Sequence, residues 1–244
     1  MISPTTKINS MAASANYLYA ITEQCVGNNV NCSNWRLERT LVSTTKWVSL
    51  PLPTPLSKYA SVMSLTAFGS DVWLSTMDQV SKPWNSYIAT SHNLGASFKV
   101  AVQPLLISVT ACGITATSQK VLWAICDEGN MQGQIPYSSD GGSHWTVYGT
   151  NQVLSHFGFG AFDPINSRLA VAVNGNYPRT LFGIANSSAP PTVMGKTPRG
   201  SFATSLCFVN PTQGVLLSDG NGMAPVSTLW YTNDGGAHWN KIAP

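Results

Sequence analysis

Acidic and amide side chains recur along the chain at similar intervals. The series is Glu23, Asp78, Asp127, Asn174 and Asp219. Carboxylate and amide oxygens accept hydrogen bonds from sugar hydroxyls and peptide N–H groups, and a ring of them can hold a cation. The alternative interpretation is that these residues are ordinary turn formers, because Asp and Asn side chains bond to their own backbone.

Aromatic and basic side chains occur in the segments near this series. An aromatic ring beside polar groups suits a stacked sugar ring or a peptide. Trp35 and Arg199 are two such neighbours. The candidate ligand-binding residues are Glu23, Asp78, Trp84, Asp127, Tyr177, Arg179 and Asp219.

Catalytic patterns are weak in this sequence. A glycosidase needs two carboxylates roughly 5–10 Å apart across the scissile bond. Asp127 with Asp78 or Asp219 is a candidate pair, but spacing along the chain cannot show whether two such carboxylates converge. The glycine-rich stretch 218–222 lacks the strand–loop–helix context of a phosphate cradle. We therefore predict no catalytic residues, no cofactor and no metal site.

The composition narrows the classes of partner and compartment. Charged residues make up 9% of the 244 residues, far below the roughly 25% of typical soluble domains. The net charge of +3 comes without a basic stripe, so no nucleic-acid partner is expected. No apolar run of about 18 residues is present, so no membrane span is expected.

The weakly charged, polar composition suggests an extracellular or cell-surface protein. Residues 1–14 lack a charged region followed by an apolar core, so they do not read as a signal peptide. We therefore expect this chain to be a processed or excised form.

Five cysteines give an odd count. Cys25 and Cys32 bracket a segment rich in Gly and Asn, and Cys112 faces Cys126 if the strands around Ser118 pair. Each pair is a candidate disulfide, and the alternative is buried free thiols, which behave as small apolar side chains. The remaining Cys207 is expected in the core. None of the cysteines has metal-site spacing.

A repeated turn motif organises the elements that must position these residues. Segments 91–98, 138–145 and 232–239 share the pattern Ser/Thr-x-Asp/Asn-x-Gly-x-x-aromatic. Asp-Gly between apolar runs predicts a hairpin, and the closing aromatic can bury a large ring between sheets. The closing aromatics are 47 and 94 residues apart, and a fixed period of this size indicates stacked blades. The pattern positions are Ser91, Asn93, Gly95, Phe98, Ser138, Asp140, Gly142, Trp145, Thr232, Asp234, Gly236 and Trp239.

This pattern resembles the Asp-box, or BNR, repeat of sialidases, sortilin and photosystem II assembly-factor-like propellers. In that family the box joins the third and fourth strands of a blade, on the face away from the ligand site. The resemblance therefore implies a β-propeller whose boxes are structural and whose ligand binds at the opposite mouth. A sialidase would also have three carboxylate-gripping arginines and a Tyr–Glu pair. The chain has five arginines and three glutamates, and no Arg-Ile-Pro start.

Five units of about 47 residues nearly exhaust the chain when counted from the boxes. Helical spacing is absent, so we predict an all-β, single-domain propeller of five four-stranded antiparallel blades. Strands are expected over ranges such as 169–173, 180–185 and 228–232. The alternative is a fragment of a six- or seven-bladed parent. The predicted blades cover residues 8–53, 55–103, 104–152, 153–198 and 199–244.

These observations predict a non-catalytic binding or scaffold propeller that recognises a glycan or an extracellular protein or peptide. Two alternatives stay open, because propellers host unrelated functions. One is a glycoside hydrolase, sialidase-like or otherwise. The other is an assembly-factor-like protein that binds a protein partner through a positive patch of Arg168, Arg179, Lys196 and Arg199.

Overall fold

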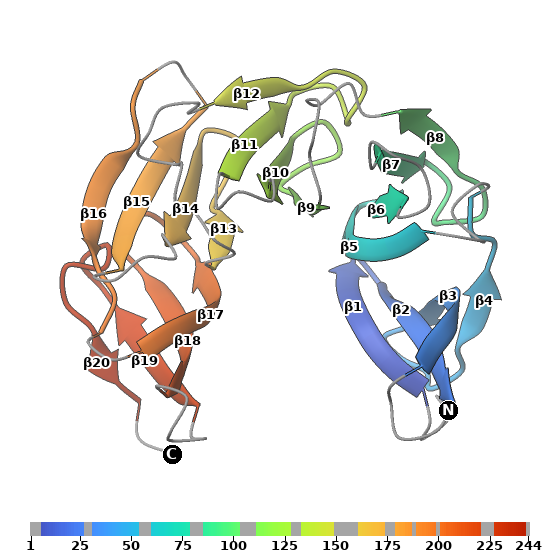
Figure 1. The fold of residues 1–244 in the computed structure, drawn as a ribbon, viewed down its shortest axis with the longest axis horizontal. Coiled ribbons are helices and arrows are strands. Elements are labelled where there is room, and N and C mark those ends of the chain that lie inside the picture. Colours follow the sequence, from blue (N-terminus) through green and yellow to red (C-terminus); the bar gives the residue numbers. More distant parts are fainter. Residues whose placement is uncertain are drawn as a thin grey trace. The chain divides into compact units, whose positions relative to one another are not determined.

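The computed structural model is all-β, and the described residues contain no helix. Five four-stranded sheets follow one another along the chain, each with its strands in sequence order (Figure 1). This is the blade organisation of a β-propeller, so the predicted fold class is confirmed. The structure describes residues 6–26, 31–53, 60–78, 85–102, 111–127, 133–148, 161–173, 179–186, 189–198, 201–220 and 227–242.

The strands of each blade are short and joined as antiparallel neighbours. Blade 1 contains β1 (Thr6–Ser14), β2 (Tyr17–Val26), β3 (Asn31–Leu41) and β4 (Val48–Leu50). Blade 2 contains β5 (Ala60–Phe68), β6 (Asp71–Asp78), β7 (Asn85–Ser91) and β8 (Lys99–Val102). Blade 3 contains β9 (Ala111–Ala116), β10 (Leu122–Asp127), β11 (Gly133–Ser138) and β12 (Thr146–Tyr148).

The last two blades have the same plan. Blade 4 contains β13 (Phe162–Pro164), β14 (Leu169–Val173), β15 (Thr180–Ala185) and β16 (Thr192–Lys196). Blade 5 contains β17 (Ser201–Phe208), β18 (Gly214–Gly220), β19 (Thr228–Thr232) and β20 (Asn240–Lys241). The second strand of each blade is rich in apolar residues, which suits burial on both faces in blades 1 to 4. In blade 5, Val215 and Leu217 of β18 are exposed, and burial alternates along the strand.

The chain divides into two compact units by its internal contacts. The first comprises Met1–Cys126 with Ser138–Trp145, and the second comprises Asp127–Tyr137 with Thr146–Pro244. Each unit has a hydrophobic core of its own. The single-domain organisation stays a prediction.

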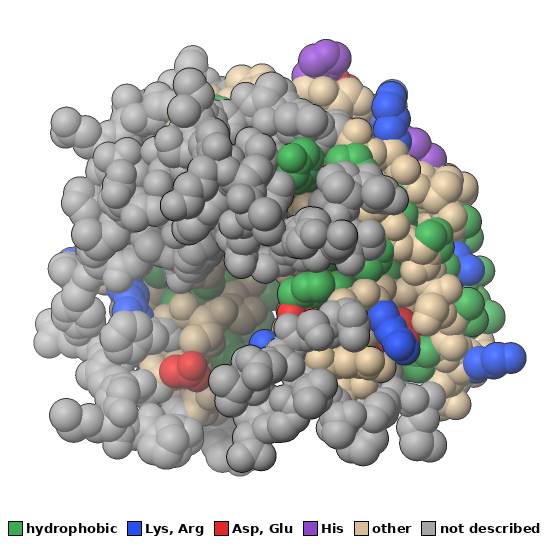
Figure 2. All heavy atoms as spheres, turned by 45° about the vertical axis from the view of Figure 1, so that its right-hand side comes forward, with side chains coloured by type: hydrophobic (Ala, Val, Ile, Leu, Met, Phe, Trp, Pro, Cys, Tyr) green, Lys and Arg blue, Asp and Glu red, His purple; other side chains and the backbone are tan. Residues whose placement is uncertain are grey.

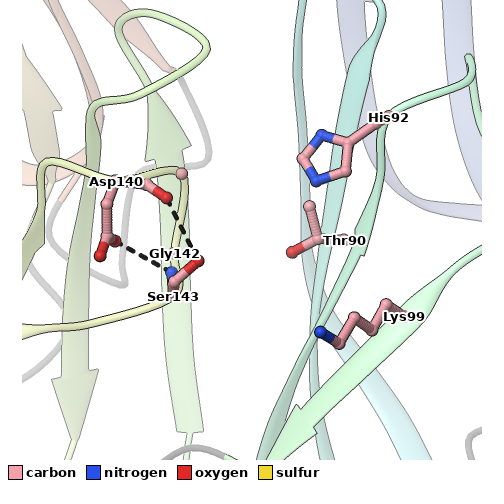
Figure 3. Close-up of a pocket in the computed structure, with 7 residues that line it drawn as sticks. Thr90, His92, Lys99, Asp140, Gly142 and Ser143 are labelled. Atoms are coloured by element: carbon pink, nitrogen blue, oxygen red, sulfur yellow. Dashed lines mark hydrogen bonds between the residues drawn. The ribbon is translucent and has the colours of Figure 1, made fainter.

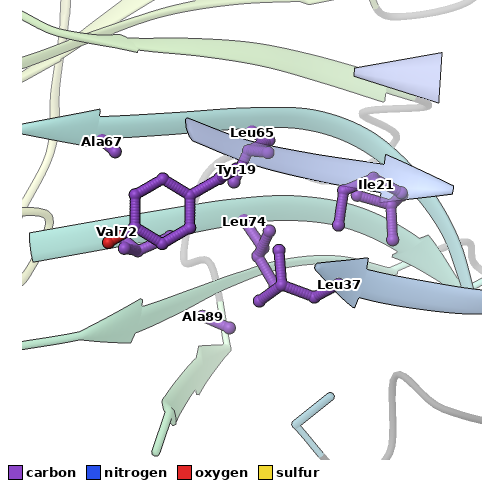
Figure 4. Packing of buried hydrophobic residues seen from close by; sticks show 9 residues of the cluster. Tyr19, Ile21, Leu37, Leu65, Ala67, Val72, Leu74 and Ala89 are labelled. Atoms are coloured by element: carbon purple, nitrogen blue, oxygen red, sulfur yellow. The ribbon is translucent and has the colours of Figure 1, made fainter. Parts of the chain in front are cut away.

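Blades 1 and 2 of the first unit share an apolar core. Tyr19 and Ile21 of β2 are fully buried and pack with Val72 and Leu74 of β6 (Figure 4). Leu37 of β3 completes this layer from the third strand of blade 1. Burying one such side chain stabilises the fold by about 1.5–3 kcal/mol. The interface between successive sheets is thus the source of stability in this unit.

The next interface in this unit is built around Trp73 of β6. This ring is fully buried with Ile88 of β7 and Leu122 of β10. Cys112 and Cys126 lie in the same cluster and form a disulfide across 14 residues of chain. Closing a loop of that length stabilises the folded state by about 3 kcal/mol in the chain-entropy account.

The other three cysteines differ in what the structure shows of them. Cys25 and Cys32 are register partners in β2 and β3, but their side chains lie outside the described residues. Cys207 is a free and exposed cysteine, so its expected place in the core is wrong. The physical reason is strand alternation. Leu206 and Phe208 face the core, so the residue between them faces away.

The second unit has an equivalent core between blades 4 and 5. Val171 and Val173 of β14 are buried with Leu181 of β15, and Leu216 of β18 joins them from blade 5. Phe208 of β17 lies in the same cluster, and Trp239 packs against it from outside. Repetition of this layer is the expected result of stacking similar sheets.

A bulge recurs in the first strands of three blades. It falls between Ile8 and Ser10, between Val62 and Ser64, and between Ala203 and Ser205. In blades 1 and 2 the serine after the bulge reaches the next blade. Ser10 Oγ accepts the N–H of Leu65 at 3.2 Å, and Ser64 Oγ accepts the N–H of Ile114 at 3.0 Å. A bulge re-aims a side chain, and here it turns a serine into an inter-blade contact.

Charged side chains are sparse on the surface, as the composition predicts. On the face that Figure 2 shows, the Lys and Arg side chains are scattered among polar and apolar ones and form no stripe. Within the ranges that the structure describes, no helix is long and apolar enough to cross a membrane.

Candidate functional site

The repeat turn of blade 3, residues 138–145, is held together by one carboxylate. Asp140 Oδ1 accepts hydrogen bonds from Ser138 Oγ at 2.9 Å and from the N–H of His144 at 2.9 Å. The N–H of Ser143 donates to the same oxygen at 3.0 Å. Asp140 Oδ2 lies 2.6 Å from His144 Nδ1. Both oxygens are therefore engaged inside the turn.

These bonds govern the charge of Asp140. Burial raises the pKa of this carboxyl, but the N–H and ring of His144 and the hydroxyl of Ser138 outweigh burial. The pKa is lowered to about 2, because hydrogen bonds to the ionised form stabilise it. A carboxylate held this way is a poor general acid and serves the turn.

The repeat turn of blade 5, residues 232–239, has the same geometry. Asp234 Oδ1 accepts from Thr232 Oγ1 at 2.9 Å and from the N–H of His238 at 2.9 Å. His238 Nδ1 lies 2.7 Å from Asp234 Oδ2. The N–H of His238, followed by its ring and the hydroxyl of Thr232, lowers the pKa of Asp234 to about 2. The two turns are structural copies of each other.

The turn of blade 2, residues 91–98, keeps the frame without the carboxylate. Asn93 Oδ1 accepts from Ser91 Oγ at 2.9 Å and from the N–H of Ser97 at 2.9 Å. Asn93 Nδ2 donates to Ser97 Oγ at 2.9 Å, where the other turns have a histidine. His92 of this turn instead faces Asp71 Oδ1 at 3.2 Å. The amide oxygen of Asn93 thus accepts the same hydrogen bonds as the carboxylate of the other turns, but it carries no charge.

The glycine of each motif has a backbone that other residues rarely adopt. φ is +82° at Gly95, +93° at Gly142 and +88° at Gly236. The first residue of each motif accepts the N–H of this glycine at 2.9 Å through its hydroxyl. The invariant positions of the motif are therefore explained by turn geometry.

One backbone hydrogen bond recurs in all five blades. The N–H that donates it follows the third strand, and the carbonyl that accepts it lies in the turn between the first two strands. The pairs are Val42 to Asn16 at 2.8 Å, Leu94 to Ser70 at 2.8 Å, Gly141 to Lys120 at 2.8 Å, Asn186 to Arg168 at 3.0 Å and Gly235 to Thr212 at 2.8 Å. Blades 1 and 4 lack the motif and keep this bond.

The closing tryptophans pack against corresponding cores, but their ring N–H groups donate to different partners. Trp145 is partly buried against the core of blades 2 and 3, and its Nε1–H donates to Gly142 O at 3.0 Å. Trp239 is partly buried against the core of blades 4 and 5, and its Nε1–H donates to Lys196 O at 3.0 Å. Each ring therefore joins its own turn to the sheet before it.

The predicted ligand-binding residues of the first unit lie away from the repeat turns. Asp78 is the last residue of β6, and its side chain lies outside the described residues. In this sheet Val72 pairs with Ser91 of the turn. Asp78 is thus about 20 Å farther along the strand. Glu23 lies near the same end of β2 and is only 7% exposed, with Lys7 Nζ 4.0 Å from its Oε2.

The second unit repeats this placement in blade 5. Gly214 of β18 pairs with Thr232 of the turn, whereas Asp219 pairs with Phe202 at the other end. The two ends are about 16 Å apart at the usual strand rise. Asp219 is exposed, and its Oδ1 accepts a hydrogen bond from Ser227 Oγ at 2.8 Å.

The remaining predicted residues are only partly visible. Asp127 is the last residue of β10, and its side chain, like the whole of Trp84 and Tyr177, lies outside the described residues. Arg179 is 8% exposed. It is therefore too buried to belong to the positive surface patch that an assembly-factor-like reading predicts. Trp35 packs partly against the core of blades 1 and 2 instead of standing free in a loop.

A pocket that the sequence did not predict lies in the first unit, on the side of the repeat turns. Its volume is about 250 Å³. Figure 3 shows Thr90, His92 and Lys99 on one wall, facing Gly142 and Ser143 on the other. The repeat period alone contains a partial signal for it, because successive turns of similar blades must lie near one another.

No protein-family model and no curated protein matches this chain. Solved structures do match it. One is YCF48 bound to a D1 peptide, with a TM-score of 0.55, 14% identity, and coverage of 98% of this chain and 83% of that one. YCF48 from Cyanidioschyzon merolae matches with a TM-score of 0.61, 13% identity, and coverage of 97% and 70%.

Two carbohydrate-active structures match as well. The phage phi92 endosialidase has a TM-score of 0.64 at 11% identity, with 98% of this chain and 58% of that one covered. A Trypanosoma rangeli sialidase has a TM-score of 0.58 at 13% identity, with 94% and 46% covered. At these identities the likeness concerns the fold, and this chain is similar in fold to both groups of β-propellers.

Proposed function

We propose that this chain is an Asp-box propeller, extracellular or on the cell surface, that binds a protein or glycan ligand without catalysis. The binding surface is the edge of the blades opposite the repeat turns. The observation that carries the proposal is the exposed carboxylate of Asp219, which lies at the end of β18 opposite the repeat turn. Asp78 ends β6 at the corresponding place, whereas Glu23 is too buried to contact a ligand without a rearrangement.

The carboxylates at the two ends of a blade differ in how many of their oxygens are engaged in hydrogen bonds within the protein. Asp140 and Asp234 each form hydrogen bonds with both carboxylate oxygens inside their own turns. Asp219, at the other end of blade 5, is exposed and accepts one hydrogen bond from Ser227. Carboxylate oxygens that lack a partner in the protein can accept hydrogen bonds from the N–H, ammonium and guanidinium groups of a peptide. They can also accept hydrogen bonds from sugar hydroxyls.

A peptide is the ligand class that we place first. This chain covers 83% of the YCF48 structure that holds a D1 peptide, but only 58% of the endosialidase and 46% of the sialidase. An acidic edge favours a peptide that carries Lys, Arg or free N–H groups. Trp84 and Tyr177 remain proposed aromatic contacts of a ligand, and both lie outside the described residues.

The test is a binding screen with paired variants in one blade. Fluorescent peptide libraries and a glycan array are probed with the wild-type chain, with Asp219→Asn and with Asp234→Asn as the matched control. Asp219→Asn should weaken the selected ligand by a factor of about ten or less, as expected for a partly exposed charge. Asp234→Asn should leave affinity unchanged, because its carboxylate serves the turn. Equal effects of the two variants would refute the assigned edge.

A glycoside hydrolase is the second candidate, favoured by the likeness to the endosialidase and sialidase. Its expected signature is turnover of a chromogenic glycoside that Asp127→Asn abolishes. The same assay on Asp234→Asn controls for damage to the fold. Turnover that survives Asp127→Asn would remove this residue from the candidate catalytic pair.

A further inference from the structure

We propose that the pocket between Thr90, Lys99 and the blade 3 turn is a second ligand site, which binds a small molecule through a single carboxylate. This pocket has a volume of about 250 Å³ and lies on the side of the repeat turns. It is separate from the edge proposed above, so each site can fail without the other.

The wall from blade 2 provides the unused polar groups. Thr90 and Lys99 are register partners in β7 and β8, so their side chains emerge side by side. Among the described residues, the Lys99 ammonium has no ion-pair partner and the Thr90 hydroxyl has no hydrogen-bond partner. His92 Nδ1 faces Asp71 Oδ1 at 3.2 Å, which leaves its other ring nitrogen for a ligand.

The opposite wall is a backbone surface whose polar groups are already used. Gly141 O accepts the Nε1–H of Trp73 at 3.0 Å, and the N–H of Gly142 donates to Ser138 Oγ. The N–H of Ser143 donates to Asp140. This wall lies across the pocket from Thr90 and Lys99 (Figure 3) and leaves the polar contacts with a ligand to the wall from blade 2.

The charges of the pocket select the class of ligand. Lys99 is the cation of the lining set, while Asp140 and the nearby Asp71 are acidic. One ammonium and one hydroxyl match a singly charged carboxylate, because each can donate a charge-assisted hydrogen bond to one of its two oxygens. A doubly charged phosphate would meet about twice the repulsion from these carboxylates that a singly charged acid meets, so the singly charged acid is the better match.

The volume sets the size of the bound group. Water occupies about 30 Å³ in the liquid, so the pocket holds the equivalent of roughly eight waters. That space suits one sugar ring or one amino-acid residue. The carboxylate therefore belongs either to a uronic-type sugar or to the C-terminal residue of a peptide.

The experiment uses the whole chain and four small probes. Glucuronate and N-acetylglycine carry the carboxylate, and methyl glucoside and N-acetylglycinamide are their neutral counterparts. Binding is followed by amide chemical shifts in two-dimensional NMR, which report both affinity and location. The variants are Lys99→Gln and Thr90→Val. Lys241→Gln is the matched control, because Lys241 is an exposed lysine of β20 in blade 5.

We expect saturable shifts at residues 90, 99 and 141–143 with one or both acids, and none with the neutral probes. Lys99→Gln should weaken the acid about tenfold, and raised salt should weaken it too, because the contact is charge-assisted. Lys241→Gln should leave it unchanged, and melting curves confirm that the variants fold. The preferred acid identifies the sugar or the peptide source. No saturable binding, equal binding of neutral probes, or an unaffected Lys99→Gln would each overturn the proposal.

Discussion

The turns of blades 3 and 5 differ from those of blades 1 and 4 in what holds them. In blades 3 and 5 a caged carboxylate, a hydroxyl and a glycine of positive φ act together. The sequences of blades 1 and 4 lack the motif, yet Val42 still donates to Asn16 and Asn186 still donates to Arg168. The backbone contact is therefore the constant part of the blade, and the motif is an added reinforcement.

Blade 2 lies between these extremes. Its turn keeps Ser91 and Gly95 but carries Asn93, so the acceptor geometry survives while the charge is lost. Arg39 of blade 1 also donates to the carbonyl of Leu94 at 2.7 Å, a contact from outside the turn. A weakened motif is thus accompanied by support from a neighbouring sheet.

The largest expected difference concerns the closing aromatic. Trp145→Ala should destabilise the protein by about 2–4 kcal/mol, because the partly buried ring loses its core contacts and its bond to Gly142. Trp47, which follows the motif-free turn of blade 1, is buried to an intermediate degree like Trp145 but is not among the described side chains that pack against the core of blades 1 and 2. Trp47→Ala should cost about 1 kcal/mol or less. Urea unfolding of both variants measures this difference. Equal losses of unfolding free energy would contradict the distinction between the two kinds of turn.

A smaller effect separates the two best copies from each other. A Cβ on Gly236 would lie 2.4 Å from Leu181 Cδ2, whereas a Cβ on Gly142 meets nothing closer than 3.5 Å. Both sites have positive φ, so each alanine costs about 1–2 kcal/mol in backbone strain. Gly236→Ala should cost about 1 kcal/mol more through the clash. Thermal melts of the two variants provide the comparison, and a reversed order would show that Leu181 moves freely.

The hydroxyl of the motif should matter less than the ring or the glycine. Ser138→Ala leaves the buried N–H of Gly142 without its acceptor and should cost about 1–2 kcal/mol. In blade 1, Thr44 is exposed, and its hydroxyl lies 3.4 Å from Leu41 O and 3.2 Å from Thr40 Oγ1, within reach of solvent. Thr44→Ala should therefore stay within about 0.5 kcal/mol. Denaturant midpoints at constant slope measure both losses. An unchanged midpoint for Ser138→Ala would show that the Ser138 hydroxyl does not stabilise the turn.

The smallest effect is a pH dependence. Asp140 and Asp234 have folded-state pKa values of about 2, below the usual 3.8, so ionisation favours the folded state. Their contribution is complete above the unfolded pKa and is lost as pH falls through about 4 toward 2. Replacing both with Asn should lower the melting temperature near pH 7, where the carboxylates contribute fully, and leave it close to the wild-type value near pH 2, so that the acid slope flattens. An unchanged acid slope would contradict the caged-carboxylate account.

Asp163 of blade 4 provides an internal contrast of opposite sign. Burial raises the pKa of this carboxyl, and the bond from the N–H of Phe208 only partly offsets it. Its folded pKa lies above the unfolded one, so the unfolded chain loses this proton first as pH rises. The contribution of Asp163 to stability is thus present at low pH and declines as pH rises through its folded pKa.

Local pattern explains why much of the fold could be predicted. The apolar ranges 169–173, 180–185 and 228–232 coincide with β14, β15 and β19, because short buried strands between turn residues leave a clear signal. The turns of blades 1 and 4 left none, since their docking bond is made by backbone atoms that any residue supplies.

The candidate sites were harder to predict than the blades. The pocket between Lys99 and Ser143 joins two segments more than forty residues apart, and its free groups are unremarkable surface types. The sequence predicts that Arg179 is an exposed basic residue, because charged side chains are seldom buried. In the structure its side chain is almost completely covered. Burial of a single polar side chain depends on the packing of neighbouring strands, which alternation alone does not specify.

The motif-free turn of blade 1 has a practical consequence for engineering. Residues 41–46 are all exposed, and the link from Val42 to Asn16 uses main-chain atoms at the start of the segment. Foreign sequence inserted after Lys46 would leave that link and the sheets behind it intact, since exposed turns tolerate insertion well. This position is a natural attachment point for an epitope, a fluorophore or a surface anchor on an otherwise unaltered propeller.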